Sequence, residues 1–177
     1  MNQIFKMRSS CPSTYIAQGE FAISAEPGAV ISTILGSCVA TCLWDPVMAL
    51  GGMNHILLPG EPSANSDASY FGAAAMEQLI NALIREGADK SRLRAKVFGG
   101  AEMYRGLTKA GNLNGVFVLD YLGRERITCE AQSIGGSLAR RVEFFPQSGA
   151  ARQRFVEDTH IPEIRPAKVE TNDIELL

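Results

Sequence analysis

Two residues of this chain could together carry out nucleophilic chemistry, Cys38 and His55. The chain has two histidines in all, and the other, His160, lies near Pro162 in a polar segment where we expect it to face water. A thiol ionises at about pH 8.5 in water, and an adjacent imidazolium lowers that value. A cysteine with a histidine as its acid and base can hydrolyse an amide or an ester through a covalent intermediate.

The spacing of the two residues predicts that they meet across a hairpin. Asp45-Pro46 is a typical turn opening between two stretches rich in β-forming side chains. If the turn pairs Asp45 with Met48, then Cys38 lies directly opposite His55, with about 5 Å between their Cβ atoms. A bulge at Gly51-Gly52 would shift this register.

The residues before Cys38 offer the other groups that such a site needs. Gly36-Ser37 allows a sharp turn, and backbone N–H groups at a turn can hold a thiolate or a developing oxyanion. A third polar group usually orients the imidazole. The nearest hydroxyls in the preceding segment are Ser32 and Thr33, and the residues alone do not choose between them.

The remaining cysteines do not form a metal site or a disulfide framework. Cys11, Cys42 and Cys129 stand at unrelated spacings, and no second Cys or His pair completes a zinc pattern. We expect Cys42 to be a small buried side chain. The sequence therefore predicts no metal and no cofactor.

The composition indicates an ordinary globular protein. The 177 residues are 46% hydrophobic and 20% charged, which suits one domain with a core of its own. Lys and Arg number 17 against 19 Asp and Glu, so there is no basic surplus for a nucleic-acid partner. No apolar run approaches the ~20 residues of a membrane helix, and the start lacks a signal-peptide pattern. We expect a cytoplasmic protein with reduced thiols.

Strands outnumber helices and do not alternate with them, which predicts an α+β domain with mostly antiparallel strands and one long helix. Apolar residues at four-residue spacing from Phe71 to Leu83, followed by Gly87, mark that helix. We expect a flexible leader at residues 1–13, a catalytic domain at 14–155 and an acidic, flexible tail at 156–177. Strands are expected at 15–24, 29–35, 38–44, 52–58, 93–98, 126–131, 140–145 and 151–155, and helices at 69–86 and 114–122.

Two segments around the candidate pair strongly resemble the CheD family of chemoreceptor glutamine deamidases. Residues 33–46 contain the LGSC turn and the Asp-Pro hairpin, and residues 51–59 contain the GGM-x-H-x-x-LP pattern at the family's spacing. Residues 96–101 match a second motif of the family. The resemblance runs from about Tyr15 to Phe155, and its closing part is carried by residues 134–136, 140–142 and 148–149.

The resemblance implies a layered α-β-β sandwich and a cysteine-dependent deamidase of glutamines on methyl-accepting chemotaxis receptors. It implies Cys38 as nucleophile and His55 as base. The family's third residue is a hydroxyl six positions before the cysteine, which is Ser32 here, while Thr33 remains a competitor because that residue is more often threonine. The resemblance also implies a CheC-type chemotaxis phosphatase as a partner.

The chain departs from the family pattern at Leu113, at Ser133 and at residues 137–139, away from the cysteine motif. These departures bear on receptor choice and partner binding rather than on the chemistry. The alternative hypothesis is an adaptor that binds a chemotaxis phosphatase with little or no catalysis. A third is a thiol amidase or esterase of small molecules, and glutamyl methyl esters are chemically accessible to the same thiol.

Overall fold

The structure, a computed structural model, describes residues 12–58, 67–103 and 110–156. The expected leader and acidic tail, with Cys11 and His160, lie outside these ranges except for residues 12, 13 and 156. Their boundaries therefore stay predictions.

The described residues form two β-sheets and two α-helices. One sheet has the strand order β1-β3-β8-β9 and the other has the order β2-β5-β4-β6-β7. The pairings β1 with β3 and β6 with β7 are parallel, and the others are antiparallel. The elements are β1 (Ser13–Tyr15), β2 (Phe21–Ser24), β3 (Val30–Leu35), β4 (Val39–Asp45), β5 (Leu50–Ile56), α1 (Asp67–Arg85), the 3₁₀ turn η1 (Lys90–Arg92), β6 (Arg94–Gly99), α2 (Ala110–Arg124), β7 (Thr128–Ile134), β8 (Ala139–Phe145) and β9 (Ala150–Val156).

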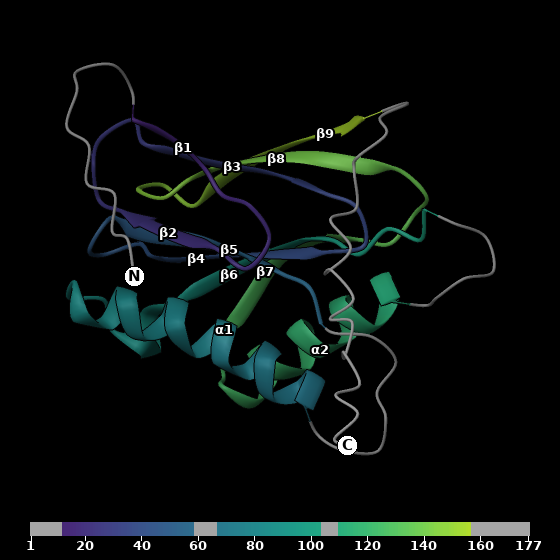
Figure 1. Ribbon diagram of the computed structural model, residues 1–177. Coiled ribbons are helices and arrows are strands. Elements are labelled where there is room, and N and C mark those ends of the chain that lie inside the picture. Colours follow the sequence, from purple (N-terminus) through teal and green to yellow (C-terminus); the bar gives the residue numbers. More distant parts are fainter. Residues whose placement is uncertain (1–11, 59–66, 104–109, 157–177) are drawn as a thin grey trace, which may run out of the picture.

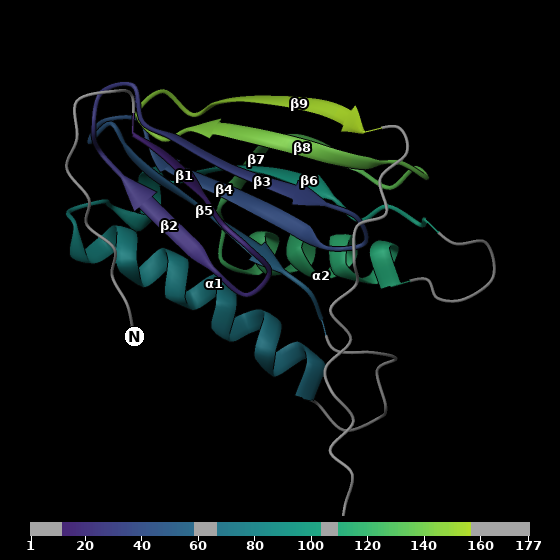
Figure 2. The same ribbon diagram turned by 45° about the horizontal axis from the view of Figure 1, so that its top comes forward.

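The elements stack in three layers (Figures 1 and 2). Both helices cover one face of the five-stranded sheet, and the four-stranded sheet covers its other face. This arrangement confirms the expected α+β class and the α-β-β sandwich, and both expected helices are present.

Strand β4 lies in the middle of the larger sheet and is buried along its whole length, because layers cover both of its faces. Its side chains alternate between two cores. Val39 and Leu43 pack with the helices, whereas Ala40, Cys42 and Trp44 pack between the two sheets. Successive side chains of β4 therefore belong to alternate layers.

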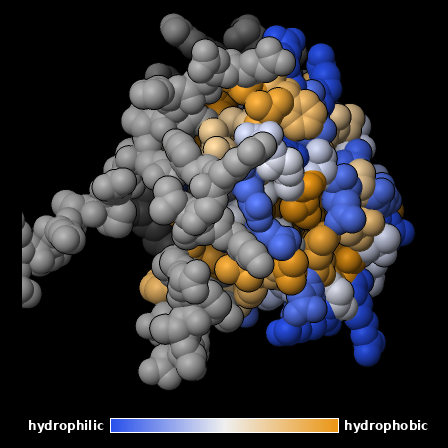
Figure 3. Space-filling model, turned by 90° about the vertical axis from the view of Figure 1, so that its right-hand side faces the viewer, coloured by the Kyte–Doolittle hydropathy of each residue, from blue (hydrophilic) through white to orange (hydrophobic). Residues whose placement is uncertain are grey.

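The candidate residues lie at one end of the sandwich. Strand β3 ends, and β4 and α2 begin, on the right-hand side in Figures 1 and 2. Cys38 lies in the connection from β3 to β4, and His55 is the residue before the end of β5. Figure 3 views the molecule from this side and shows hydrophobic patches separated by hydrophilic side chains on the described surface.

Several expected elements have different bounds in the structure. The strand expected at 52–58 is Leu50–Ile56, and the helix expected at 114–122 is Ala110–Arg124. The segment 15–24, expected as one strand, forms β1 and β2 in different sheets, because the chain turns between Tyr15 and Phe21. In this turn Glu20 N donates to Ala17 O at 3.0 Å. Strand β7 begins two residues later than expected, because Arg126 has a φ of 57° and belongs to the turn after α2.

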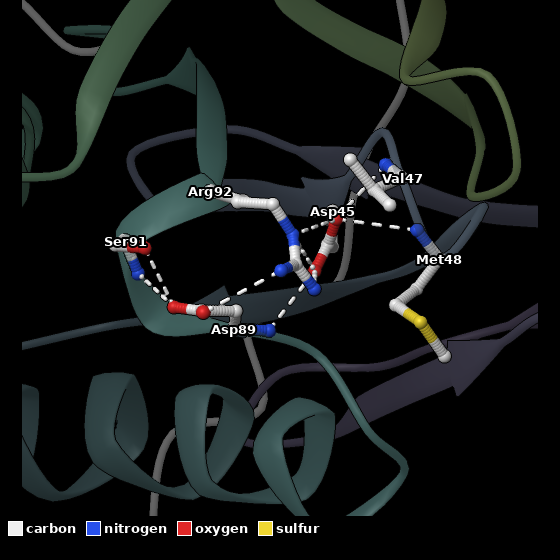
Figure 4. A network of polar contacts seen from close by, with 6 residues as sticks. All are labelled: Asp45, Val47, Met48, Asp89, Ser91 and Arg92. Carbon is white, nitrogen blue, oxygen red and sulfur yellow. Dashed lines mark hydrogen bonds and ion pairs between the residues drawn. The ribbon is translucent and has the colours of Figure 1, made fainter.

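The β4–β5 hairpin has a different register from the predicted one. Asp45 pairs with Leu50 rather than Met48, so the loop is residues 46–49. The Asp45 carboxylate is the reason: its Oδ1 accepts hydrogen bonds from Val47 N at 2.9 Å and from Met48 N at 3.2 Å, which takes both N–H groups out of strand pairing (Figure 4). The pairing then runs without a bulge along the whole of β4, although Gly51-Gly52 could have hosted one.

The same carboxylate ties the hairpin turn to the segment after α1 (Figure 4). Arg92 Nη2 donates to Asp45 Oδ2 at 2.8 Å, and Asp89 N donates to it at 2.9 Å. Asp45 is fully buried. Burial by itself raises its pKa, but the hydrogen bonds from Arg92 and from backbone N–H groups outweigh this and hold the pKa well below its ordinary value.

We expect Asp45→Asn to lower the free energy of unfolding by about 3 kcal/mol at pH 7, because the amide leaves Arg92 and the turn N–H groups without a charged acceptor. The pKa of Asp45 is lower in the folded than in the unfolded state. Its stabilisation is therefore complete above pH ~4 and is lost as the pH falls towards the folded-state pKa.

Urea unfolding at pH 7 and pH 3 measures this difference, and the gap between wild type and Asp45→Asn should be smaller at pH 3. The control is Glu143→Gln, which removes a half-exposed carboxylate 3.9 Å from Arg141 and should change the stability by less than ~0.5 kcal/mol. An equal loss for Asp45→Asn at both pH values would contradict the prediction.

Candidate active site

Cys38 and His55 share a face of the sandwich but are not directly opposite each other. The structure pairs Ala40 with His55, so the predicted Cys38–His55 pairing is wrong. The hairpin loop has two more residues than predicted, which shifts the strand pairing by two residues. A shift of two leaves every strand side chain on its original face. Cys38 itself lies one residue before β4, in the connection from β3. It packs against the core between the two sheets.

The hydroxyl that contacts the imidazole is that of Thr33. Its Oγ1 lies 2.8 Å from His55 Nδ1 and donates its own proton to Ile16 O at 2.7 Å. A hydroxyl has one proton, so Oγ1 must accept from Nδ1–H. Ser32 points to the opposite face of β3, because adjacent residues of a strand alternate.

This contact leaves Nε2 of His55 as the unprotonated ring nitrogen. Within the described part of the chain, Nε2 is buried and makes no hydrogen bond. Burial lowers the pKa of His55 to about 4, while a backbone hydrogen bond with Ile16 and the charge of Glu20 act in the opposite direction. The imidazole is therefore neutral at pH 7 and can accept a proton.

The backbone of residues 36–38 is held by three successive hydrogen bonds to its carbonyl groups. The donors, in chain order of the carbonyls, are Ala101 N at 2.9 Å, Asn114 Nδ2 at 2.8 Å and Gly100 N at 2.8 Å. In a trans peptide the N–H points away from the preceding C=O. The N–H groups of Ser37 and Cys38 therefore point away from the residues that hold the carbonyls of Gly36 and Ser37.

Gly99 allows the close approach on which this arrangement depends. Its φ is +116°, a value that residues other than glycine rarely adopt. A Cβ at this position would overlap the carbonyl oxygen of Cys38. Gly100 also has a positive φ, of 66°. The Gly-Gly pair at the end of β6 thus forms both a tight turn and a close backbone contact.

A buried arginine, Arg140, holds the chain at the end of β7, which in turn contacts the end of β6. Arg140 is only 1% exposed, and its guanidinium donates to Ser133 O at 2.5 Å and to Gly135 O. Gly135 N in turn donates to Gly99 O at 2.9 Å. Arg140 therefore acts on the Cys38 turn through two intervening loops.

Asn114 is a site residue that the sequence analysis did not identify as functional. It is 1% exposed, and its amide donates to Ser37 O while its Oδ1 accepts from Leu58 N at 3.0 Å. It thereby joins the Cys38 turn to the chain just after His55. Its residue type gave no signal, because Asn114 was expected at the start of a helix, where asparagine is a favourable cap, whereas α2 begins at Ala110.

Gln18 is a second residue that the sequence analysis missed. The Cys38 thiol donates to its side-chain oxygen Oε1 at 3.9 Å. Gln18 and His55 also line an open groove of about 420 Å³ between the turn before β2, the end of β5 and α1, with Leu57 and Phe71 among its apolar walls. No sequence motif marks Gln18, because the contact depends on the packing of the β1–β2 turn.

The other cysteines of the described region lie in settings that favour the thiol form. Burial raises the pKa of Cys42 far above its ordinary value, and burial also raises the pKa of Cys129. Among the described residues, no cluster of three or more His, Cys, Asp or Glu side chains could hold a metal ion. None of the helices in the described ranges is long and apolar enough to cross a membrane.

A thiol, a buried neutral imidazole and a hydroxyl that orients it are the groups that thiol-dependent hydrolases use. Residues 57–155 match the family model CheD, described as CheD chemotactic sensory transduction. The chain is 47% identical over 150 residues to a Caulobacter sp. (strain K31) protein described as "Probable chemoreceptor glutamine deamidase CheD", with 84% of this chain and 80% of that protein covered.

Two further relatives carry the same description. The chain is 43% identical to an Agrobacterium fabrum protein, with 96% of this chain and 98% of that protein covered. It is 51% identical to an Acidiphilium cryptum protein, with 80% and 76% covered. The chain therefore belongs to the CheD family. Among solved structures, the Neisseria meningitidis protein NMB0706 is 8% identical with a TM-score of 0.48 over 80% of this chain and 72% of that one, a likeness too distant to transfer detail.

We expect Gly99→Ala to disturb the Cys38 turn, because the new Cβ meets the Cys38 carbonyl oxygen and φ is unfavourable. The free energy of unfolding should fall by about 2 kcal/mol or more. The rate at which iodoacetamide alkylates Cys38, followed by peptide mapping of the folded protein, should change several-fold.

The matched control is Gly149→Ala. Gly149 has a φ of 73°, and a Cβ there would overlap the indole of Trp44, so this variant carries comparable strain away from Cys38. It should lose stability while the alkylation rate of Cys38 stays close to that of wild type. The same alkylation rate in both variants would count against a role of Gly99 in positioning the thiol.

Proposed function

We propose that this chain is a chemoreceptor glutamine deamidase, which converts glutamine side chains of methyl-accepting chemotaxis receptors to glutamate with release of ammonia. The family membership supports the substrate class. The geometric observation that carries the proposal is the hydrogen bond between Thr33 and His55 Nδ1. It leaves Nε2 as a base in the layer between the two sheets, against whose core Cys38 also packs.

In the first step of the proposed mechanism, Cys38 Sγ attacks the carboxamide carbon of the receptor glutamine. His55 Nε2 takes the thiol proton as the new carbon–sulfur bond forms. The carboxamide oxygen becomes an oxyanion, which the backbone N–H groups of Ser37 and Cys38 hold. Their orientation supports this role, because the carbonyls of Gly36 and Ser37 are engaged on the other side.

In the second step the tetrahedral intermediate collapses. The carbon–nitrogen bond breaks, the imidazolium of His55 gives its proton to the leaving nitrogen, and ammonia departs. A water molecule then gives a proton to His55 and attacks the thioester carbon. The carbon–sulfur bond breaks, Cys38 regains a proton, and the product is glutamate. Thr33 holds the ring throughout.

The consequence for the receptor is electrostatic. Each turnover replaces a neutral side chain by a negative one at pH 7. Added charge on a receptor surface can shift the balance between two signalling states. The mixed hydrophobic and hydrophilic surface at this end of the molecule (Figure 3) suits a protein substrate.

The other hypotheses stand apart from this proposal. An adaptor with little or no catalysis is not favoured, because it leaves the Thr33–His55 contact and the clamped Cys38 turn without a purpose. A CheC-type phosphatase partner, hydrolysis of small amides and a cytoplasmic location stay predictions. The last of these agrees with the need of a thiol nucleophile for reducing conditions.

We expect Cys38→Ala to lower the rate of ammonia release by about 10³-fold or more while the protein stays folded, because no other group can form the thioester. Intact-mass analysis of a receptor fragment follows the gain of ~1 Da for each glutamine that becomes glutamate. Cys129→Ala is the control, since it removes a half-buried thiol and should retain activity. Undiminished deamidation by Cys38→Ala would refute the proposed nucleophile.

A second experiment decides between the two hydroxyls. We expect Thr33→Val to lower kcat for the receptor glutamine by about 10- to 100-fold with KM nearly unchanged, because His55 loses the acceptor for Nδ1–H. Thr33→Ser should restore most of the rate, and Ser32→Ala should behave like wild type. The reverse pattern, with the loss confined to Ser32→Ala, would make Ser32 the third residue. Thermal unfolding of each variant separates this effect from misfolding.

A further inference from the structure

A side chain that accepts a hydrogen bond from Cys38 carries the same functional group as the proposed substrate. Gln18 presents its carboxamide oxygen Oε1 to the Cys38 thiol at 3.9 Å. Gln18 is exposed, on the turn between β1 and β2. A glutamine side chain of the enzyme therefore lies where a receptor glutamine has to approach the sulfur.

The backbone that carries Gln18 is fixed to the candidate site. Gly19 N donates to His55 O at 2.9 Å, and His55 N donates to Glu20 O at 3.0 Å. On the other side of Gln18, Ile16 O accepts the proton of Thr33 Oγ1. The turn thus keeps a constant position relative to His55 and Thr33, while the exposed side chain of Gln18 can reorient.

Gln18 and His55 also line a groove beside the candidate site, although Cys38 is not among its lining residues. The groove of about 420 Å³ that Gln18 lines is within the range of ligand sites and exceeds the volume of one glutamine side chain. Leu57, Phe71 and Ala74 give this groove apolar walls suited to the methylene groups of a glutamine. Gln78 is the corresponding carboxamide on the α1 side of the groove.

We propose that Gln18 determines specificity for a carboxamide: its Oε1 accepts a hydrogen bond from the substrate NH₂ once the thiol has given its proton to His55. This inference rests on the proposed function. A carboxamide NH₂ has two protons to donate, whereas an ester oxygen has none. Gln18 therefore favours glutamine over a glutamyl methyl ester at the same thiol, because an ester leaves Oε1 without its donor.

The contact fits the course of the reaction. In the free enzyme the Cys38 thiol donates a hydrogen bond to Gln18 Oε1. When the thiol proton moves to His55 and the carbon–sulfur bond forms, Oε1 becomes available to accept another hydrogen bond. The substrate nitrogen then bonds to Oε1 until it takes the proton from His55 and leaves as ammonia. Gln18 gains and loses no covalent bond in this sequence.

The test compares an amide and an ester on the same enzyme. Gln18→Met has nearly the same length and no strong donor or acceptor. We expect it to lower kcat/KM for the receptor glutamine by about 10- to 100-fold. Acylation of Cys38 by p-nitrophenyl acetate, an activated ester without N–H groups, should stay within about twofold of wild type after subtraction of the Cys38→Ala background. Gln132→Met, at an exposed position of β7 outside this groove, is the matched control and should leave both rates unchanged.

Several results would overturn the proposal. An equal loss on both substrates would mean that Gln18 only positions Cys38, and no loss on the amide would mean that it takes no part. A gain of ~1 Da at Gln18 itself in wild type but not in Cys38→Ala would show that Gln18 is a substrate rather than a residue that determines specificity. Wild-type turnover of receptor glutamine with an unchanged Gln18→Met rate refutes this inference alone, whereas no wild-type turnover refutes the proposed function and the inference with it.

Discussion

The candidate site depends on one constraint, the clamped backbone of residues 36–38. Three consecutive carbonyls accept hydrogen bonds from two residues just after β6 and from α2, and Gly99 at the end of β6 comes so close that no side chain fits. Because these donors belong to elements far apart in sequence, the turn forms only when both sheets and α2 are in place. The position of the sulfur is thus a property of the whole sandwich rather than of the loop that carries it.

The second requirement is a base that is neutral and correctly oriented. Burial between the sheets disfavours the charged imidazole, and Thr33 fixes the ring with Nδ1 protonated because its own proton is committed to Ile16. A buried imidazole gains charge at a cost when it accepts the thiol proton. Glu20 and the Ile16 carbonyl favour the charged ring and reduce that cost.

Much of the fold could be predicted because its signals are local. The four-residue spacing of apolar side chains identified α1, and the alternation of strand residues placed Cys38 and His55 on one face. The register of the β4–β5 hairpin was missed although the hydrogen bonds of Asp45 with the two loop N–H groups are local. Only the contacts that hold this carboxylate in place, from Asp89 and Arg92, come from more than 40 residues away. The split of segment 15–24 into two strands has a non-local cause, since β1 and β2 pair in different sheets.

The sequence by itself determined the type of chemistry and the side chains that could perform it, because residue identity and strand parity are local properties. It identified Cys38 and His55, and it left Ser32 and Thr33 open. Only the tertiary structure decided that Thr33 is the hydroxyl against the imidazole, that Asn114 and Gly99 hold the thiol turn, and that Gln18 faces the sulfur. The physical reason is that these contacts join separate layers, whose separation and register result from the packing of two sheets and two helices around a shared core.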